Sequence, residues 1–191
     1  GGKVHGRVTG IAHFVVKSER EAMELVHRLL SFLPANSGEE PPRAACTDSP
    51  QRLVPELREV IPERSKQAFD VRDVIKPVVD QGDFLEIQKL FAPNIVIGFA
   101  RLEGRPVGIV GNQPRVIAGC LDVNASWKAA RFVRFCDAFN LPLITFVDCP
   151  GYLPGLDQEH LGIIRKGAKL LYAFSESVVP KFTVIMRKAY W

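Results

Sequence analysis

Apolar positions at helical spacing mark residues 18–33 as the clearest helix of the chain. Ser18 and Glu21 stand at the spacing of a capping box, in which each side chain accepts a hydrogen bond from a free backbone N–H of the first turn. Pro34 ends the predicted helix. Its apolar face consists of Ala22, Leu25, Val26, Leu29, Leu30 and Leu33.

Residues 34–62 interrupt this pattern with six of the 14 prolines of the chain. Proline removes a backbone donor and blocks regular structure, so this stretch predicts a linker and a domain boundary. Just beyond it, Asp70 is placed to cap a short helix. That helix would carry Val71, Val74, Ile75 and Val78.

From residue 84 onward, strand-like and helix-like patterns alternate. Glu103-Gly104 is typical of a turn between two strands, which predicts a β-hairpin. The expected strands are 84–90, 94–102, 105–113, 141–149 and 180–186, and the expected helices are 126–140 and 161–177. A hairpin followed by helix, strand, helix and strand predicts an α/β fold.

The faces of these later elements can also be predicted. The helix over 126–140 should turn Phe132, Phe135, Cys136 and Phe139 to one side, with Lys128, Arg131 and Arg134 on a charged outer face. In the helix over 161–177, Ile164, Ala168 and Leu171 are expected to face inward. The strands over 141–149 and 180–186 are nearly continuous apolar runs, which is typical of strands buried on both faces.

Composition narrows the class of protein. The chain has 191 residues, 47% hydrophobic and 24% charged, which excludes wholesale disorder. No apolar run reaches the roughly 20 residues of a membrane helix, so no membrane association is expected. The net charge of +4 comes from the second part of the chain, since residues 91–191 hold 12 basic and 7 acidic residues. It contains no basic run of the nucleic-acid type, and it fits a small polyanion or an ordinary solvated surface equally well.

The four cysteines are scattered singly, at positions 46, 120, 136 and 149. No pair has the Cys-x-x-Cys spacing of a zinc site, so we expect no metal in this chain. A chain of this size also has no need of a disulfide framework, so we expect reduced thiols.

Two loops are candidates for chemistry. Residues 148–155 (Asp-Cys-Pro-Gly-Tyr-Leu-Pro-Gly) follow a predicted strand and precede a predicted helix. Residues 111–121 also follow a strand, and small residues dominate their end. Ligands of open α/β sheets bind beyond the carboxyl ends of strands, where glycine lets the backbone approach them closely. A plain turn remains an equally good interpretation of each loop.

At these two loops the sequence resembles the carboxyltransferase β subunits of biotin-dependent acyl-CoA carboxylases. The resemblance extends over essentially the whole chain. The motifs that carry it are residues 48–57, 94–114, 118–122, 130–140, 148–155, 158–159 and 162–172.

The resemblance implies a partial crotonase-like (ClpP/crotonase) carboxyltransferase fold with three regions. Residues 1–34 would be the tail of the N-terminal half, 35–69 a proline-rich linker, and 70–191 the truncated front of the C-terminal half. It also implies the transfer of a carboxyl group from carboxybiotin to the α-carbon of propionyl-CoA or a similar acyl-CoA, through an enolate.

Site residues and partners follow from the same resemblance. The acyl and biotin pocket would be lined by Gly151, Tyr152, Leu153, Gly155, Gln158 and Gly162, and the acyl-CoA path by Gly119, Cys120 and Leu121. Biotin would arrive on a biotin-carrier or biotin carboxylase subunit, and the β subunits would form a homo-oligomer. The location would be the cytoplasm in a bacterium or the mitochondrial matrix in an animal.

The sequence departs from the family pattern at several positions. Leu161 stands where the family has a glycine, Lys166 where it has a histidine, and Trp191 where the second glycine pair begins. The catalytic glycine pairs, whose backbone N–H groups hold the oxyanions, would therefore lie outside this chain. We expect the isolated chain to be inactive. The alternatives are a non-catalytic assembly segment and a subunit of a methylmalonyl-CoA-type decarboxylase.

Overall fold

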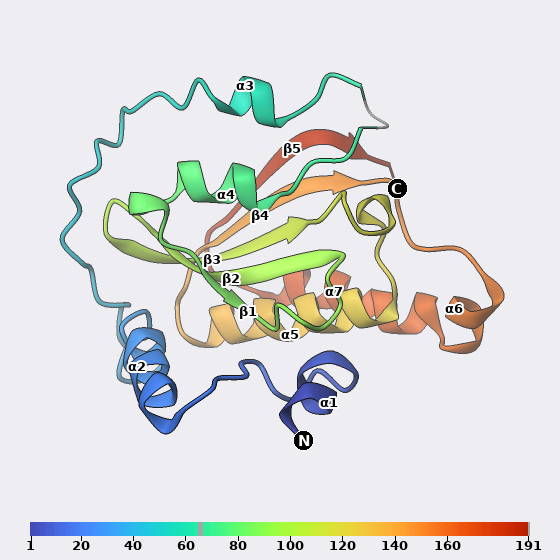
Figure 1. The fold of residues 1–191 in the computed structure, drawn as a ribbon, viewed down its shortest axis with the longest axis horizontal. Coiled ribbons are helices and arrows are strands. Elements are labelled where there is room, and N and C mark those ends of the chain that lie inside the picture. The colour runs from blue at the N-terminus through green and yellow to red at the C-terminus, as the bar shows by residue number, and fades with distance from the viewer. Residues whose placement is uncertain (65–66, 191) are drawn as a thin grey trace.

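A five-stranded mixed sheet forms the centre of the molecule, and helices lie on both of its faces (Figure 1). The computed structural model describes residues 1–64 and 67–190. The strands stand in the order β1-β2-β3-β4-β5; β1, β2 and β3 pair antiparallel, whereas β3, β4 and β5 pair parallel. Their bounds are Leu85–Ile87 (β1), Ile95–Leu102 (β2), Arg105–Asn112 (β3), Leu143–Cys149 (β4) and Lys181–Ala189 (β5).

The predicted hairpin is confirmed. Strands β2 and β3 pair from Ile95 opposite Asn112 to Leu102 opposite Arg105. Gly104, in the turn, has a φ of +75°, and a Cβ there would stand 2.0 Å from the carbonyl oxygen of Ala44. The turn therefore needs glycine both for its backbone conformation and for contact with the linker.

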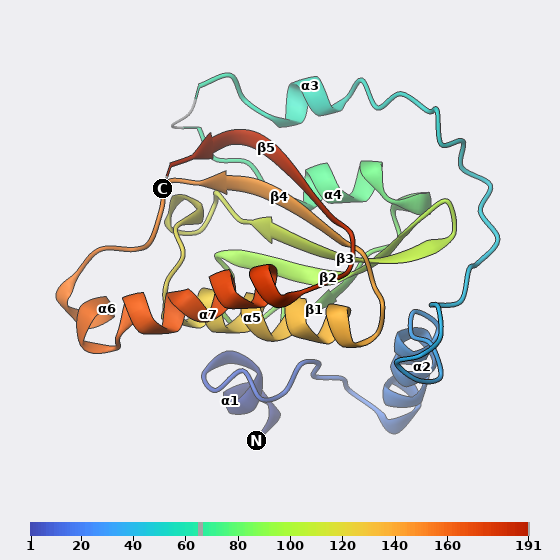
Figure 2. The ribbon, with the colours of Figure 1, turned by 180° about the vertical axis from the view of Figure 1, so that it is seen from behind.

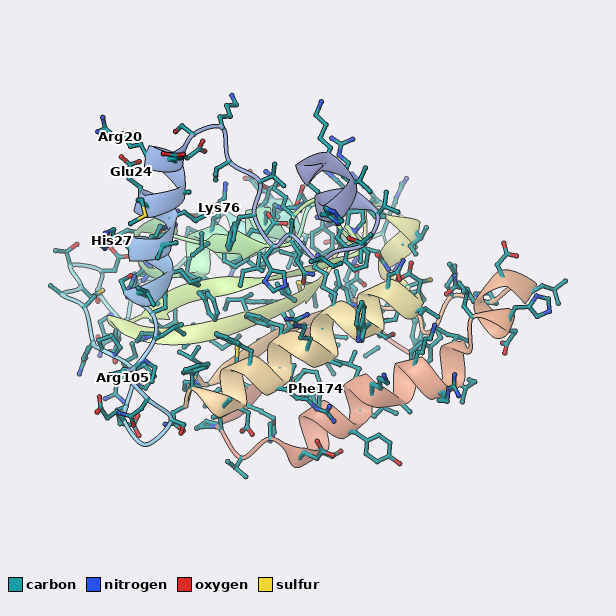
Figure 3. All side chains as sticks on the ribbon, turned by 90° about the horizontal axis from the view of Figure 1, so that it is seen from below. Arg20, Glu24, His27, Lys76, Arg105 and Phe174 are labelled. Carbon is teal, nitrogen blue, oxygen red and sulfur yellow. The ribbon has the colours of Figure 1, made fainter. Side chains whose placement is uncertain are left out.

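Two long helices, α5 (Val123–Ala138) and α7 (Ile163–Glu176), cover one face of the sheet (Figure 2). Phe174 lies between them (Figure 3). Helix α5 begins three residues earlier than predicted because the Asp122 carboxylate caps it, accepting a hydrogen bond from the Ala125 N–H at 2.7 Å. None of the helices in the described part of the chain is long and apolar enough to cross a membrane.

The predicted inward face of α7 is wrong by one residue. Ile164 is 69% exposed and Leu171 is 56% exposed. Gly167 determines the orientation, because the ring of Tyr152 lies 2.7 Å from the position of an added Cβ. One residue corresponds to about 100° of rotation on a helix, enough to exchange buried and exposed positions. The residues of α7 that face the core are Ile163, Gly167, Leu170 and Ala173.

Strand β5 is not buried, contrary to the prediction. It forms an edge of the sheet and extends three residues farther than expected. Phe182 is 62% exposed and Ile185 is 63% exposed. An apolar run predicts a buried strand only where neighbouring elements cover it, and no described element covers this part of β5.

The other face of the sheet carries α4 (Arg72–Val78), which confirms the predicted short helix. The N-cap is Val71 and not Asp70 as predicted; Asp70 lies one residue earlier, and its carboxylate accepts a hydrogen bond from the Arg72 N–H at 2.9 Å. Between residues 34 and 62, the chain runs around the outside of the molecule and forms one four-residue helix, α3 (Leu57–Val60) (Figure 1). This irregular path agrees with the proline content of the segment.

The N-terminal part contains α1 (Gly2–Arg7), which the sequence pattern does not predict, and α2 (Glu19–Leu30), which it does. The Ser18 hydroxyl accepts a hydrogen bond from the Glu21 N–H as predicted, but the Glu21 carboxylate accepts one from Lys17, one residue before the cap. Arg20, Glu24 and His27 of α2 point away from the sheet (Figure 3), whereas Arg28 pairs with Asp83, just before β1. Beyond α2, Phe32 is fully buried and stacks on Phe99 of β2 at 5.7 Å.

One residue of the predicted charged face of α5 lies inside the protein. Lys128 is 2% exposed, and its Nζ donates to the carbonyl oxygens of Gln88, Phe91, Ala92 and Ile95 at 2.7 to 3.2 Å. The four carbonyl oxygens take the place of water around the amine, and Lys128 can therefore be buried although its position on the helix predicted an exposed side chain.

Candidate functional site

The carboxyl ends of β3, β4 and β5 meet at one edge of the sheet, as their arrowheads show (Figure 2). The loop after Asn112 and the loop after Cys149 both begin there. Parallel strands place these loops side by side, and such an edge is where open α/β sheets bind ligands.

The structure joins the two predicted loops directly. The Leu121 N–H donates to the Gly151 carbonyl at 3.0 Å, and the Leu153 N–H donates to the Leu121 carbonyl at 2.9 Å. Leu121 and Tyr152 thus form a short parallel bridge. Six of the nine predicted site residues come together in this way: Gly119, Cys120, Leu121, Gly151, Tyr152 and Leu153.

Gly119 is the tightest point between the loops. Its φ is +81°, and an added Cβ would lie 2.4 Å from the carbonyl oxygen of Asp148. The side-chain amide of Asn112 donates to the Gly119 carbonyl at 3.2 Å. The end of β3 and the end of β4 therefore hold this glycine from both sides.

Asn94 is a site residue that the sequence analysis missed. Its side-chain amide donates to the Cys120 carbonyl at 2.9 Å and to the Asp122 carboxylate at 3.1 Å. Its own carbonyl accepts from the Gln113 N–H at 2.9 Å. Asn94 is 2% exposed, so these bonds fix the path of the 119–122 loop. The only signal in the sequence is a polar residue immediately before an apolar strand.

Gln158 ties the second loop to α5, because its Oε1 accepts a hydrogen bond from the Val123 N–H at 3.0 Å. Gly155 and Gly162 begin α6 (Leu156–His160) and α7 with φ values of +136° and +75°. An added Cβ would meet no atom within 4 Å at either glycine, so both have open space beside the backbone. Leu161, which stands between α6 and Gly162, is 51% exposed.

Two ionisable side chains at the paired loops, Cys149 and Tyr152, are neutral at pH 7. Burial raises the pKa of Cys149, and burial together with the neighbouring Cys149 raises the pKa of Tyr152. Leu121 is 2% exposed, and its backbone N–H and carbonyl both bond to the other loop. The paired loops thus offer a fixed shape lined by neutral side chains.

A buried ion pair, which sequence reasoning also missed, fixes the ends of β4 and β5. The Arg187 guanidinium lies 2.7 Å from the Asp148 carboxylate, which also accepts the Lys188 N–H at 3.0 Å. Arg187 donates further to the carbonyls of Arg64 and Gln67 at the end of the linker. The available signal was an arginine directly after the apolar run that ends at Met186. Trp191, the departure from the family pattern noted above, lies outside the described residues.

The described residues contain no group of three or more His, Cys, Asp or Glu side chains that could hold a metal ion. All four cysteines are free thiols; Cys136 and Cys149 are buried, and Cys46 and Cys120 are half-buried.

Comparison with known proteins connects this site to one family. The profile of the carboxyl transferase domain matches residues 1–190. The propionyl-CoA carboxylase carboxyltransferase subunit of Haloferax mediterranei is 54% identical over 190 residues, which are 100% of this chain and 37% of that protein. The methylmalonyl-CoA decarboxylase subunit alpha of Veillonella parvula is 50% identical, with the same two shares.

A solved structure of transcarboxylase 12S, with hydrolysed methylmalonyl-coenzyme A bound, superimposes with a TM-score of 0.95 at 51% identity. The match covers 97% of this chain and 36% of that one. It confirms the expected α/β, crotonase-like carboxyltransferase fold. The chain belongs to the carboxyl transferase domain family, and it spans about a third of the length of the curated relatives that it matches.

Proposed function

We propose that this chain is part of the carboxyltransferase subunit of a biotin-dependent acyl-CoA carboxylase. The reaction is the transfer of a carboxyl group from carboxybiotin to the α-carbon of propionyl-CoA or a similar acyl-CoA. One observation supports this above the others: the loops that carry the family motifs are bonded together through Leu121 and Tyr152 at the carboxyl edge of the sheet.

The proposal assigns three regions to the chain. Residues 1–34 are the end of an N-terminal half, residues 35–69 are the linker, and residues 70–191 are the front of a C-terminal half. The irregular path of residues 34–56 supports a linker there. The contact of Phe32 with Phe99 supports a fixed position of the first region against the third.

We assign the acyl-CoA path to Gly119, Cys120 and Leu121. The acyl and biotin pocket is assigned to Gly151, Tyr152, Leu153, Gly155, Gln158 and Gly162. Open space beside Gly155 and Gly162 fits the close approach of a planar ring such as that of biotin, because no Cβ occupies it. When bound, carboxybiotin supplies the carboxyl group that is transferred. The loops themselves orient the reactants, and the neutral side chains of Cys149 and Tyr152 leave the proton transfer to other groups.

Partners follow from the same proposal. A biotin-carrier or biotin carboxylase subunit delivers the biotin, and the chain works within a homo-oligomer. The related transcarboxylase 12S is described as a hexamer assembly, which supports the second point. The location is the cytoplasm in a bacterium or the mitochondrial matrix in an animal. A relative from Mus musculus that is 56% identical is named mitochondrial.

A second candidate function is that of a methylmalonyl-CoA-type decarboxylase subunit. The Veillonella parvula relative, at 50% identity over the whole chain, favours it. Both functions require the same loops to hold an acyl-CoA, so the direction of net carboxyl transfer distinguishes them.

A chimaeric enzyme tests the proposal. Residues 1–190 replace the corresponding third of the Haloferax mediterranei subunit, and propionyl-CoA carboxylation is assayed with that enzyme's own biotin-bearing partner. We expect carboxylation within about tenfold of the parent, and none from the isolated chain, because loss of one oxyanion donor alone reduces the rate about 10²-fold or more.

The matched control is the same chimaera with Gly155→Val, whose side chain would enter the open space beside the loop. We expect its carboxylation rate to fall about 10²-fold, because the added side chain would displace a reactant from its position. An assembled chimaera that decarboxylates methylmalonyl-CoA but cannot carboxylate propionyl-CoA would establish the second candidate. An assembled chimaera without either activity would contradict both.

A further inference from the structure

A groove of about 390 Å³ lies on the helix side of the sheet, away from the paired loops. Residues 13 and 14, before α2, and Leu29 of α2 form one wall, and α5 together with the β1 and β2 region forms the other. Its apolar lining includes Phe14, Leu29, Phe99 and Phe135. The volume is within the range of small-molecule sites. None of the residues assigned above to acyl-CoA or biotin lines it.

Two polar groups at this groove have no partner within the described residues. The Nε2 atom of His13 is buried and makes no hydrogen bond. Arg131 lies close enough for its charge, after burial, to lower the pKa of His13, yet its guanidinium forms no hydrogen bond or ion pair with any described residue. A buried polar atom without a partner, such as His13 Nε2, is costly unless a water, an ion or a ligand completes its bonding.

The other cations of the lining are already engaged. Arg134 pairs with Glu176 at 3.0 Å, and Lys128 is held by four carbonyl oxygens. Arg131 is therefore the cation of the described lining that is available for a ligand. One cation beside a neutral imidazole is complementary to a ligand group that carries a single negative charge and accepts hydrogen bonds.

We propose that this groove binds an amphipathic carboxylate, with the carboxylate between Arg131 and His13 Nε2 and the alkyl chain among the phenylalanine rings. A purely polar anion would leave the apolar walls unfilled, and an uncharged alkyl chain would leave the buried His13 Nε2 without a partner and make no use of the charge of Arg131. Charge and apolar surface together therefore select a fatty-acid-like ligand of moderate length.

Nuclear magnetic resonance of the histidine rings tests the proposal with octanoate as the probe. The chain has four histidines, and of these only His13 is in the described lining of the groove. We expect octanoate to shift the ring signals of His13 in a saturable manner while His5, His27 and His160 serve as internal controls. Acetate and 1-octanol, each lacking one of the two features, should bind at least about tenfold more weakly.

Variants distinguish the contribution of the Arg131 charge to octanoate binding from that of the space in the groove. Arg131→Gln should weaken octanoate binding at least about tenfold, whereas Arg165→Gln, an exposed arginine on α7, should leave it unchanged. Leu29→Trp should block binding by filling the groove, with an unchanged circular dichroism spectrum. Octanoate that shifts all four histidines alike, or that binds Arg131→Gln as well as the parent chain, would overturn the proposal.

Discussion

Replacement of Lys128 by Met is expected to lower the free energy of unfolding by about 3 kcal/mol at pH 7, because it removes hydrogen bonds between a buried amine and backbone carbonyls. Methionine has nearly the same length, so little volume is lost. The closest acceptors are the carbonyls of Phe91 and Ile95, at 2.7 and 2.8 Å. Without the amine, these buried oxygens lose a donor that no water replaces.

The effect should depend on pH in a defined direction. Burial lowers the pKa of Lys128 from 10.5 to about 7, a shift that Arg72 reinforces and Glu86 and Asp122 oppose. Between pH 7 and 10.5 the unfolded chain therefore binds more protons at this residue than the folded chain does. The contribution of Lys128 to the free energy of unfolding therefore rises with pH over that range. The difference in this free energy between the parent chain and Lys128→Met should widen from about pH 7 to about pH 10.

Urea unfolding at several pH values measures both quantities. Lys89→Met is the matched control, because Lys89 is exposed and forms none of these bonds. We expect it to change the free energy of unfolding by less than about 0.5 kcal/mol. Equal stability of the two variants, or a difference that narrows as the pH rises, would refute this account of Lys128.

Replacement of Gly119 by Ala is expected to cost about 3 kcal/mol, from left-handed backbone strain and from a contact too close to relax easily. Its φ is +81°, and the new methyl group would stand 2.4 Å from the Asp148 carbonyl oxygen. Relief requires the 119–121 loop to move away from the end of β4. We therefore also expect the bridge between Leu121 and Tyr152 to weaken, which hydrogen exchange of the Leu121 and Leu153 amides would report.

Gly162→Ala measures how much stability is lost through backbone strain alone. Gly162 has a similar φ of +75° but no atom within 4 Å of an added Cβ, so strain alone should cost about 1 kcal/mol. The difference between the two variants measures the contact with Asp148. If both variants lose equal stability, the close approach of the two loops is not what requires glycine at position 119.

Much of the fold from residue 84 onward can be read from the sequence. Strands and helices differ in their hydrophobic period, and this difference locates β2, β3, α5, β4 and α7 to within a few residues. The two candidate loops could be located for a related reason, since glycine and proline mark the places where regular structure ends. Their meeting at one edge follows from the parallel direction of β3 and β4.

Burial was harder to predict. Strands β4 and β5 are similarly apolar, yet α5 and α7 cover β4 while much of β5 remains exposed. The inward face of α7 depends on Gly167 receiving the ring of Tyr152, a contact between different elements. The hydrophobic pattern of the sequence shows which residues are able to be buried, but the elements that pack against them in the fold decide which residues are buried.

The sequence by itself determined the family resemblance, the order of the elements and the loops that carry the proposed site, since these depend on local residue patterns. Only the folded chain revealed the roles of Lys128, Asn94 and Arg187. Each of these polar side chains bonds to residues at least 26 positions away. Such a side chain is satisfied in the interior only by partners that the fold brings to it, and no local pattern specifies them.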